Sequence, residues 1–325
     1  MTPLRITLAL RSPLGTPLAG DTLFGQLCHA VLEAEGPAEL VRLLDGYTRG
    51  APWLVVSDGF PHGYLPRPTL PPLAQTKPEE RKAAKGKRWI PLAAAALPLP
   101  QLLAAAANDE TAYGKDMAPI GATAQHNTLN RLTGTTGKGE FAPYTIPQTF
   151  HAAGQKIDLW CVLDETRCPV DRLSELLSAI GATGYGRDAS IGLGKFDVAS
   201  IDTALLCTAF GAPPAPARCV PSGTFPAAHW TLAPCAPQGQ GFDGERSHWR
   251  VLTRFGRHGG ALALGANPFK NPILLAAAGA VLVPQGEFAP RFFVGQGLTG
   301  VSKAEPATVH QGYAPALPMQ LEAVP

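Results

Sequence analysis

The chain has 325 residues, 45% of them hydrophobic and 16% charged, and its formal net charge at pH 7 is +2. These values exclude an intrinsically disordered chain and a uniformly basic nucleic-acid-binding protein, so any contact with nucleic acid must come from local patches. The length is sufficient for two domains of ordinary size, and the 35 glycines and 33 prolines predict many turns and long connections.

Metal binding, secretion and membrane insertion are not expected from the sequence. The six cysteines form no C-x-x-C pair and the histidines show no metal-ligand spacing, so neither a metal nor another cofactor is predicted. The N-terminus lacks an apolar signal segment, and Pro91, Pro98 and Pro100 interrupt the longest apolar stretch, residues 90–107. We therefore expect a cytoplasmic protein with reduced thiols.

The first predicted elements are a strand, a loop and a helix. Residues 4–10 alternate between apolar and other side chains, which is typical of a half-buried strand. A loop over residues 12–17, rich in proline and glycine, leads to Asp21, a candidate helix N-cap. The apolar stripe of a helix begins at Leu23.

Residues 50–125 are interpreted as loops and insertions on the first domain. They contain a Pro-rich stretch over 66–78, a basic run from Lys77 to Arg88 and an Ala-rich segment. The basic run has the charge to contact RNA phosphates. A solvated loop is the commoner outcome for a run of charges, and we favour it here.

A strand–helix–strand series is predicted farther along the chain. Strands over 157–163 and 196–201 enclose a helix over 171–180 and a glycine-rich loop. Together with the opening strand and helix, this is the element order of a ferredoxin-like βαββαβ domain, so we predict an α+β domain over 1–203. Prolines mark a linker over 204–226.

The remaining residues, 227–325, are predicted to form a second, β-rich domain. Its expected strands cover residues 230–232, 249–255, 273–283, 291–294 and 310–319. Within them only residues 273–278 also suit a helix, because a short apolar run fits both structures.

The glycine-rich loop is the most informative segment of the sequence. Its glycines permit close backbone approach, and exposed N–H groups together with cations suit a phosphate backbone. It lacks the spacing of a Walker loop and the strand-to-helix position of a Rossmann fingerprint. A tight helix-to-strand turn is the alternative. The candidate RNA-binding residues of this loop are Gly184, Gly186, Arg187, Ser190, Gly192, Gly194 and Lys195.

A polar hairpin is predicted around residues 127–141, because Thr133 to Gly139 has the composition of a turn. Asn127, Arg131 and Lys138 are its candidate RNA contacts. An ordinary solvent-facing hairpin is equally compatible with this segment.

Residues 246–286 contain no acidic side chain. In a strand over 249–255, two arginines lie on one face while Trp249 and Phe255 lie on the other. Basic side chains beside aromatic ones suit single-stranded RNA, although an amphipathic strand without RNA remains the alternative. The candidate RNA-binding residues here are Arg250, Arg254, Arg257 and His258.

The search for catalytic motifs is negative. The sequence contains no G-x-S-x-G, no H-E-x-x-H and no G-G-D-D. His126, His151 and His258 are isolated candidates for a general base, but lone histidines are more often structural. We therefore expect no catalysis.

Three segments resemble the handle-binding RAMP subunit of type III-A CRISPR (Csm) effector complexes. The first comprises Ser12-Pro13 to Gly15 and Gly20-Asp21-Thr22-Leu23-Phe24-Gly25-Gln26-Leu27-Cys28. The second runs from Gly184 to Phe196, with an Asp-x-Ser-x-Gly-x-Gly-x-Phe core that begins at Asp188. The third is Thr308-Val309-His310-Gln311-Gly312-Tyr313-Ala314. They stand in the family's order and span nearly the whole chain.

The resemblance implies two ferredoxin-like (RRM-like) RAMP domains, the second degenerate, and a subunit without nuclease activity. Such a subunit grips the 5′ handle of the crRNA and contacts the large signalling subunit and the first backbone RAMP subunit in antiviral defence. The resemblance also implies RNA contacts at Gly20, Asp21 and Thr22, and a β-hairpin thumb around Asn127 to Phe141.

Three other functions remain open at this point. The first is a RAMP-fold endoribonuclease that cleaves CRISPR repeat RNA, with His126 or His258 as its acid or base. The second is the equivalent subunit of a type III-B or III-D complex. The third is a structural bridge with protein contacts only, in which Arg187 and Lys195 play no part in RNA affinity.

Overall fold

The first half of the chain is built on an antiparallel sheet around the strand β1 (Thr2–Leu10). The computed structural model, which describes residues 1–71, 86–203 and 227–321, pairs β1 with β8 (Lys156–Leu163) and with β9 (Phe196–Asp202). β2 (Leu54–Val56) and β3 (Phe60–Pro61) pair with the other side of β8, so the strand order is β2-β8-β1-β9. With helices after β1 and after β8, the elements of this half follow the predicted βαββαβ order.

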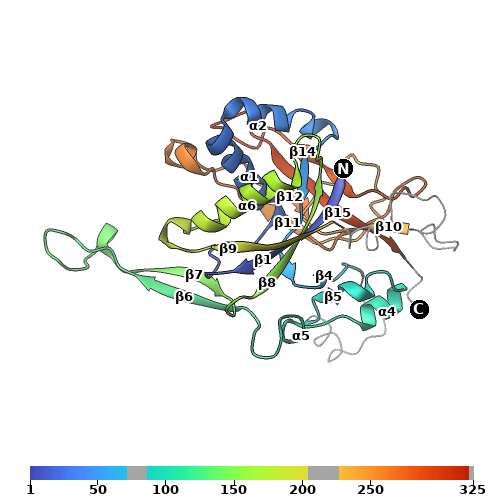
Figure 1. Ribbon diagram of the computed structural model, residues 1–325, viewed down its shortest axis with the longest axis horizontal. Helices are drawn as coiled ribbons and strands as arrows, with labels where there is room; N and C mark the ends of the chain where they lie inside the picture. The colour runs from blue at the N-terminus through green and yellow to red at the C-terminus, as the bar shows by residue number, and fades with distance from the viewer. Residues whose placement is uncertain (72–85, 204–226, 322–325) are drawn as a thin grey trace.

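Three helices lie together beside this sheet (Figure 1). They are α1 (Gly20–Glu35), α2 (Pro37–Leu44) and α6 (Val170–Thr183). The predicted apolar stripe of α1 is buried, and α6 buries the side chains of Leu173, Leu177 and Ile180. The predicted N-cap is wrong: Ala19 occupies that position, and Asp21 lies in the first turn of α1 with its carboxylate turned to other partners.

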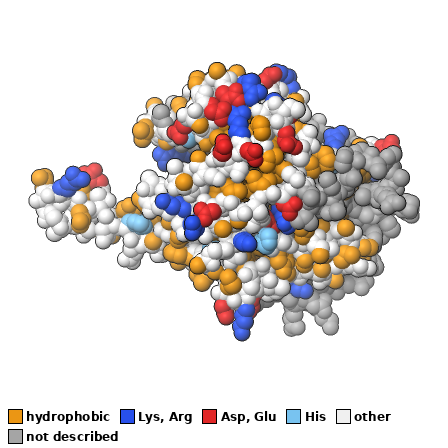
Figure 2. Space-filling view, in the orientation of Figure 1, with side chains coloured by type: hydrophobic (Ala, Val, Ile, Leu, Met, Phe, Trp, Pro, Cys, Tyr) orange, Lys and Arg blue, Asp and Glu red, His pale blue; other side chains and the backbone are white. Residues whose placement is uncertain are grey.

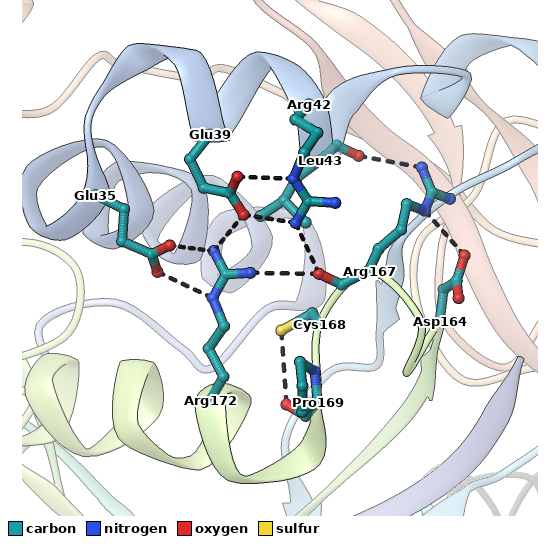
Figure 3. Close-up of polar contacts among 9 residues, drawn as sticks. All are labelled: Glu35, Glu39, Arg42, Leu43, Asp164, Arg167, Cys168, Pro169 and Arg172. Atoms are coloured by element: carbon teal, nitrogen blue, oxygen red, sulfur yellow. Dashed lines mark hydrogen bonds and ion pairs between the residues drawn. The ribbon is translucent and has the colours of Figure 1, made fainter.

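A cluster of ion pairs joins these helices to the loop that precedes α6 (Figure 3). Arg172 of α6 contacts both Glu35 and Glu39, at 2.5 and 2.9 Å. Arg167 pairs with Asp164 at 2.9 Å and donates to three backbone carbonyls of the α2–β2 connection. Those carbonyls belong to Leu43, Asp45 and Ala51. The side chain of Arg167 therefore ties the α2–β2 connection, whose Tyr47 and Trp53 are buried in the core, to the loop that precedes α6.

The prediction of loops and insertions over residues 50–125 is wrong for β2 and β3, which belong to the main sheet, whereas the other described residues of this range form a small lobe and the start of an arm. The lobe contains β4 (Tyr64–Pro66), β5 (Trp89–Pro91), α4 (Leu99–Ala104) and α5 (Asp109–Tyr113). The arm is a hairpin of β6 (Ile120–His126) and β7 (Tyr144–Phe150), which projects from the body of the molecule (Figure 1). Most of the basic run lies outside the described residues; at its end, Arg88 forms an ion pair with Asp109.

The second half is a β-structure. A four-stranded sheet has the order β13 (Val281–Leu282), β10 (Ala227–Thr231), β15 (His310–Gln320) and β14 (Phe293–Leu298). β11 (Val251–Arg254) pairs with β12 (Ile273–Ala276) in a separate two-stranded ribbon. The helical alternative for residues 273–278 is wrong, because pairing with β11 holds this segment as a strand. The strand predicted over 273–283 is divided in two at Gly279, which has a φ of +85°.

One hydrophobic core joins the two halves. Trp230 and Leu317 of the second half belong to the same cluster of buried side chains as Leu4 and Trp53 of the first. A smaller cluster under β12 and β14 completes the packing of the second half. The predicted linker over 204–226 lies outside the described residues, and the domain limits proposed from the sequence stay a prediction.

The described ranges contain no membrane-spanning helix, metal-binding cluster or disulfide. No helix there is long and apolar enough to cross a membrane. No group of three or more His, Cys, Asp or Glu side chains in these ranges is placed to hold a metal ion. The four cysteines of these ranges, Cys28, Cys161, Cys168 and Cys235, are free thiols.

We predict that Arg167→Ala lowers the free energy of unfolding by about 2 kcal/mol, because three backbone carbonyls and Asp164 lose a charged donor. The matched control is Arg49→Ala, whose ion pair with Asp45 is exposed on both sides. This control should cost less than about 0.5 kcal/mol. Urea denaturation of both variants measures the difference, and equal losses would contradict the role assigned to Arg167.

Candidate nucleic-acid interface

The N-terminal motif and the glycine-rich loop pack directly against each other. The side-chain amide of Gln26 donates to the carbonyl of Gly184 at 2.9 Å and accepts from the N–H of Gly186 at 3.1 Å. The buried Tyr185 hydroxyl donates to the carbonyl of Pro17 at 2.9 Å and accepts from the N–H of Ala19 at 3.1 Å. Two segments about 160 residues apart are thus held by side chain–backbone hydrogen bonds.

The glycines of the loop are required by this close packing. Gly194 has a φ of +75°, and a Cβ at this position would lie 2.1 Å from the carbonyl oxygen of Tyr185. Gly192 has a φ of +97° but faces open space, with no atom within 4 Å of a Cβ. Gly194 is therefore needed for space as well as conformation, whereas Gly192 is needed for conformation alone.

The loop does not present a free row of N–H groups to a phosphate backbone, as the sequence analysis expected. Four of its N–H groups, those of Gly186, Arg187, Gly194 and Lys195, donate to Gln26, Thr16, Pro13 and Ser12. The expectation is wrong for these four groups, because the glycines bring the loop against the N-terminal segment. The side chains of Arg187, Ser190 and Lys195 remain exposed.

Arg187 connects the glycine-rich loop to the base of the arm. Its guanidinium donates to the carbonyl of Pro147 in β7 at 2.6 Å and pairs with Asp188 at 2.9 Å. Leu14 of the N-terminal segment exchanges two backbone hydrogen bonds, each 2.9 Å, with Thr149. The loop, the N-terminal segment and the arm therefore form one continuous surface.

The predicted hairpin residues form the outer end of the arm. Residues 133–139, which have the composition of a turn, lie in the tip that connects β6 and β7. This tip also includes the short 3-10 helix η3 (Gly139–Phe141). Asn127, Arg131 and Lys138 are exposed there, and the side chain of Leu132 is 97% exposed. Figure 2 shows basic, acidic and hydrophobic side chains together at this end of the projecting arm.

The carboxylate of Asp21 is buried where the two halves meet. Arg254 of β11 donates to it at 2.6 Å, and Nε2 of His310, at the start of β15, lies 3.5 Å away. The second distance is too long for a good hydrogen bond. Burial raises the pKa of Asp21, but the neighbouring His310 and Arg254 outweigh it and leave this pKa below its ordinary value.

This pairing changes the assignment of two predicted RNA-binding residues. Asp21 is 4% exposed, and Arg254 faces inward to reach it. The two faces predicted for the strand are present. On the basic face Arg254 is turned toward Asp21 in α1 whereas Arg250 is exposed, and on the other face Val251 and Phe255 are exposed. We therefore assign Asp21 and Arg254 a structural role, in which their ion pair joins the two halves of the molecule, and not a direct contact with RNA.

The C-terminal motif also ends at α1 and β2. The side-chain amide of Gln311 accepts from the N–H of Val56 at 2.9 Å and donates to its carbonyl at 2.8 Å, as a neighbouring strand would. The hydroxyl of Tyr313 donates to the carbonyl of Tyr47 at 2.7 Å. All three motifs found in the sequence therefore meet at the N-terminal half of α1.

A second carboxylate, Asp58, lies beside this junction. Its Oδ1 accepts from the N–H of Gly20 at 2.8 Å. Burial and the nearby charge of Asp21 raise the pKa of Asp58 to about 7, although the hydrogen bond from Gly20 acts in the opposite direction. At the start of α1 there are thus two carboxyl groups whose pKa values are shifted in opposite directions, Asp21 downward and Asp58 upward.

The other predicted residues lie around the ribbon of β11 and β12. Arg250 is exposed, and the guanidinium of Arg257 lies 5.7 Å from the ring centre of Phe269. Nε2 of His258 is 2.7 Å from the hydroxyl of Ser302.

Four residues that make contacts where the three motifs meet, at the start of α1, were not singled out from the sequence. Three of them, Gln26, His310 and Gln311, lie inside the quoted motifs, whereas Asp58 carried no signal.

Comparison with known proteins identifies the fold. No family model matches the sequence, and no curated protein matches it. A chain in the crystal structure of a Csm1–Csm4 cassette with pppApA is 14% identical, with 99% of this chain and 98% of that chain covered and a TM-score of 0.52. A chain in the Csm3–Csm4 subcomplex of the type III-A CRISPR-Cas interference complex is 10% identical, with coverages of 95% and 99% and a TM-score of 0.54. A chain in the Csm1–Csm4 cassette with one ATP is 14% identical, with 99% of this chain and 98% of that chain covered and a TM-score of 0.51.

These matches define the class of fold as that of a subunit of type III CRISPR complexes, over nearly the whole chain. The subunit common to the three structures is Csm4. The resemblance to this Csm subunit that the motifs indicate is therefore confirmed at the level of the fold.

We predict that Gly194→Ala destabilises the protein far more than Gly192→Ala. The first variant adds both a left-handed alanine and a clash with Tyr185, for a loss of about 3 kcal/mol or more. The second adds the left-handed alanine alone, for roughly 1 kcal/mol. Thermal and urea denaturation of the pair measure the two losses, and equal stabilities would show that the loop is not packed as described.

We predict that Asp58 makes the protein less stable as the pH rises from 4 to 7. The folded state keeps the Asp58 proton up to about pH 7, whereas the unfolded chain releases it near 4, so folding binds a proton in this window. The free energy of unfolding should therefore fall, by up to about 1.4 kcal/mol per pH unit from this group. Asp58→Asn keeps an acceptor for Gly20 and should remove this slope in urea titrations; an unchanged slope would contradict the assignment.

Proposed function

We propose that the chain is the non-catalytic, Csm4-like subunit of a type III-A CRISPR effector complex, which binds the 5′ handle of the crRNA. The observation that carries the proposal is the meeting of the three family-like motifs at the start of α1. Motifs that only share a composition would have no reason to lie together across more than 280 residues. The shared fold with structures that contain Csm4 supports the same conclusion.

The RNA surface in this proposal runs from the glycine-rich loop to the end of the arm. Arg187 and Lys195 are exposed beside the base of the arm, and Arg131 and Lys138 are exposed at its tip. Cations along a path of this kind bind a phosphate backbone without reading its sequence. The fully exposed Leu132 suits contact with an unstacked base, so we infer that the arm acts as a thumb.

The architecture in this proposal is that of two ferredoxin-like, RRM-like domains. The strand order β2-β8-β1-β9 with α1 and α6 supports this interpretation for residues 1–203. In residues 227–325 a four-stranded antiparallel sheet without such helices among the described residues suits a degenerate copy.

The partners follow from the assemblies in which the similar fold occurs. Csm4 is present with Csm1 in one kind of structure and with Csm3 in the other. We infer that this chain likewise bridges a large signalling subunit and a backbone RAMP subunit in antiviral defence. The exposed apolar side chains described below give it surface for such contacts.

The surroundings of His126 and His258, the two histidines that an endoribonuclease of this kind would use, do not favour catalysis at either position. The ring of His126 stacks on Tyr144 at 5.6 Å, and His258 hydrogen-bonds to Ser302. Neither is joined by a described hydrogen bond to a carboxylate or a second histidine, the pairing that acid–base cleavage of RNA commonly uses.

We predict that the double variant Arg187→Ala/Lys195→Ala binds a 5′-handle RNA at least about tenfold more weakly at 100 mM salt. Each lost phosphate contact should also reduce the slope of log K against log salt by about 0.7. The matched control, Arg49→Ala/Lys303→Ala, removes an exposed, ion-paired arginine and an exposed lysine elsewhere. Fluorescence anisotropy measures both. If the two double variants bind alike, the glycine-rich loop is not part of the RNA surface.

A further inference from the structure

The ribbon of β11 and β12 has one face attached to the body, and its other face is exposed apart from Ala276, which is buried. The register pairs Thr253 with Leu274, so these two side chains and the neighbours two residues away share a face. On this face the side chains of Val251, Phe255 and Leu274 are 68%, 75% and 60% exposed. The opposite face carries Arg254, which is bound to Asp21.

The apolar face continues beyond the two strands. Arg257 and Phe269 form an isolated bridge that extends the ladder, and the Phe269 side chain is 68% exposed. Between them lies the 3-10 helix η5 (Gly260–Leu264), whose last residue, Leu264, is 90% exposed. We call this surface the ribbon face. It consists of Val251, Phe255, Leu264, Phe269 and Leu274.

The ribbon is firmly attached to the rest of the protein, so its apolar side chains are held out by the fold. The buried Asp21–Arg254 pair fixes β11 to the start of α1. Gly260 lies so close to the ring of His29 in α1 that a Cβ would come within 2.6 Å of it. Figure 1 shows η5 next to α1 at the edge of the molecule. Exposed apolar side chains on a rigid support are typical of an interaction site.

The charges around the ribbon face select the kind of partner. No acidic residue occurs between Arg246 and Gly286, and the exposed Arg250 and Arg257 flank the face. The face therefore complements an apolar surface that has carboxylates at its edge. RNA is a poorer match, because the aliphatic side chains at the centre offer nothing to phosphates. In addition, Arg254 is occupied by Asp21.

We propose that the ribbon face is a docking site for a second protein subunit of the same complex, with an apolar contact surface edged by Asp and Glu side chains. The surface itself follows from the contacts above, and only the assignment of the partner to an effector complex rests on the proposed function.

The test uses the double variant Phe255→Glu/Leu274→Glu in the tagged full-length chain, purified from its native cell. The matched control is Val41→Glu, an equally exposed aliphatic residue on α2, at 70%. Mass spectrometry should show at least a tenfold loss of one co-purifying subunit with the double variant and no loss with the control. The affinity of the purified variant for a 5′-handle RNA should stay within twofold of the wild type. Because added lysines suit an acidic partner, Phe255→Lys/Leu274→Lys should lose less of that subunit.

Each other outcome has a definite meaning. Equal recovery of every subunit with the double glutamate variant overturns the docking site and leaves the proposed function standing. If the recovery of every subunit is unchanged but the double variant binds RNA more weakly, the ribbon face is an RNA surface. If a differently tagged copy of this chain is recovered, the ribbon face is a self-association surface. Both outcomes overturn the proposal. Should the wild type bring down no other subunit, the docking site and the proposed function fall together. If thermal denaturation shows the double variant to be unfolded, Leu274→Glu alone carries the test.

Discussion

The buried carboxylate of Asp21 is the constraint on which the arrangement of the two halves depends. A charge that is 4% exposed is tolerated only with a partner, and Arg254 supplies that partner from 233 residues away at 2.6 Å. Once this pair forms, the start of α1 must face the ribbon, and His310 brings the beginning of β15 to the same point. The shared hydrophobic core includes Leu23 and Phe24, which follow Asp21 closely in α1.

The glycine-rich loop has a different role in the structure from the one that its composition first indicates. Its backbone is used to bind the N-terminal segment, and Gly194 is needed because no Cβ fits against Tyr185. The loop thereby becomes a rigid support from which Arg187 and Lys195 extend beside the arm. A support of this kind suits recognition of a phosphate backbone by side-chain charge, and places the thumb-like arm next to it. On the other side of the junction, the same Asp21–Arg254 pair presents the ribbon face.

Much of the first half could be predicted because its patterns are local. Alternation marks β1, the apolar stripes mark α1 and α6, and the turn composition of residues 133–139 marks the end of the arm. The extent of the arm's strands was not predicted, since β6 has no buried side chain and β7 buries only Ile146 and Gln148. The helix or strand ambiguity of residues 273–278 is resolved only by pairing with β11. Likewise, the inward direction of Arg254 depends on Asp21, a contact that no local pattern reveals.

We propose that this chain belongs to a ribonucleoprotein that carries guide RNA. The most direct measurement is purification of the tagged wild-type chain from its native cell, with sequencing of the bound RNA and mass spectrometry of the bound proteins. We expect guide RNAs that share one repeat-derived 5′ tag, together with a large signalling subunit and backbone RAMP subunits. Recovery of the intact chain with neither such RNAs nor such subunits would contradict the proposed function.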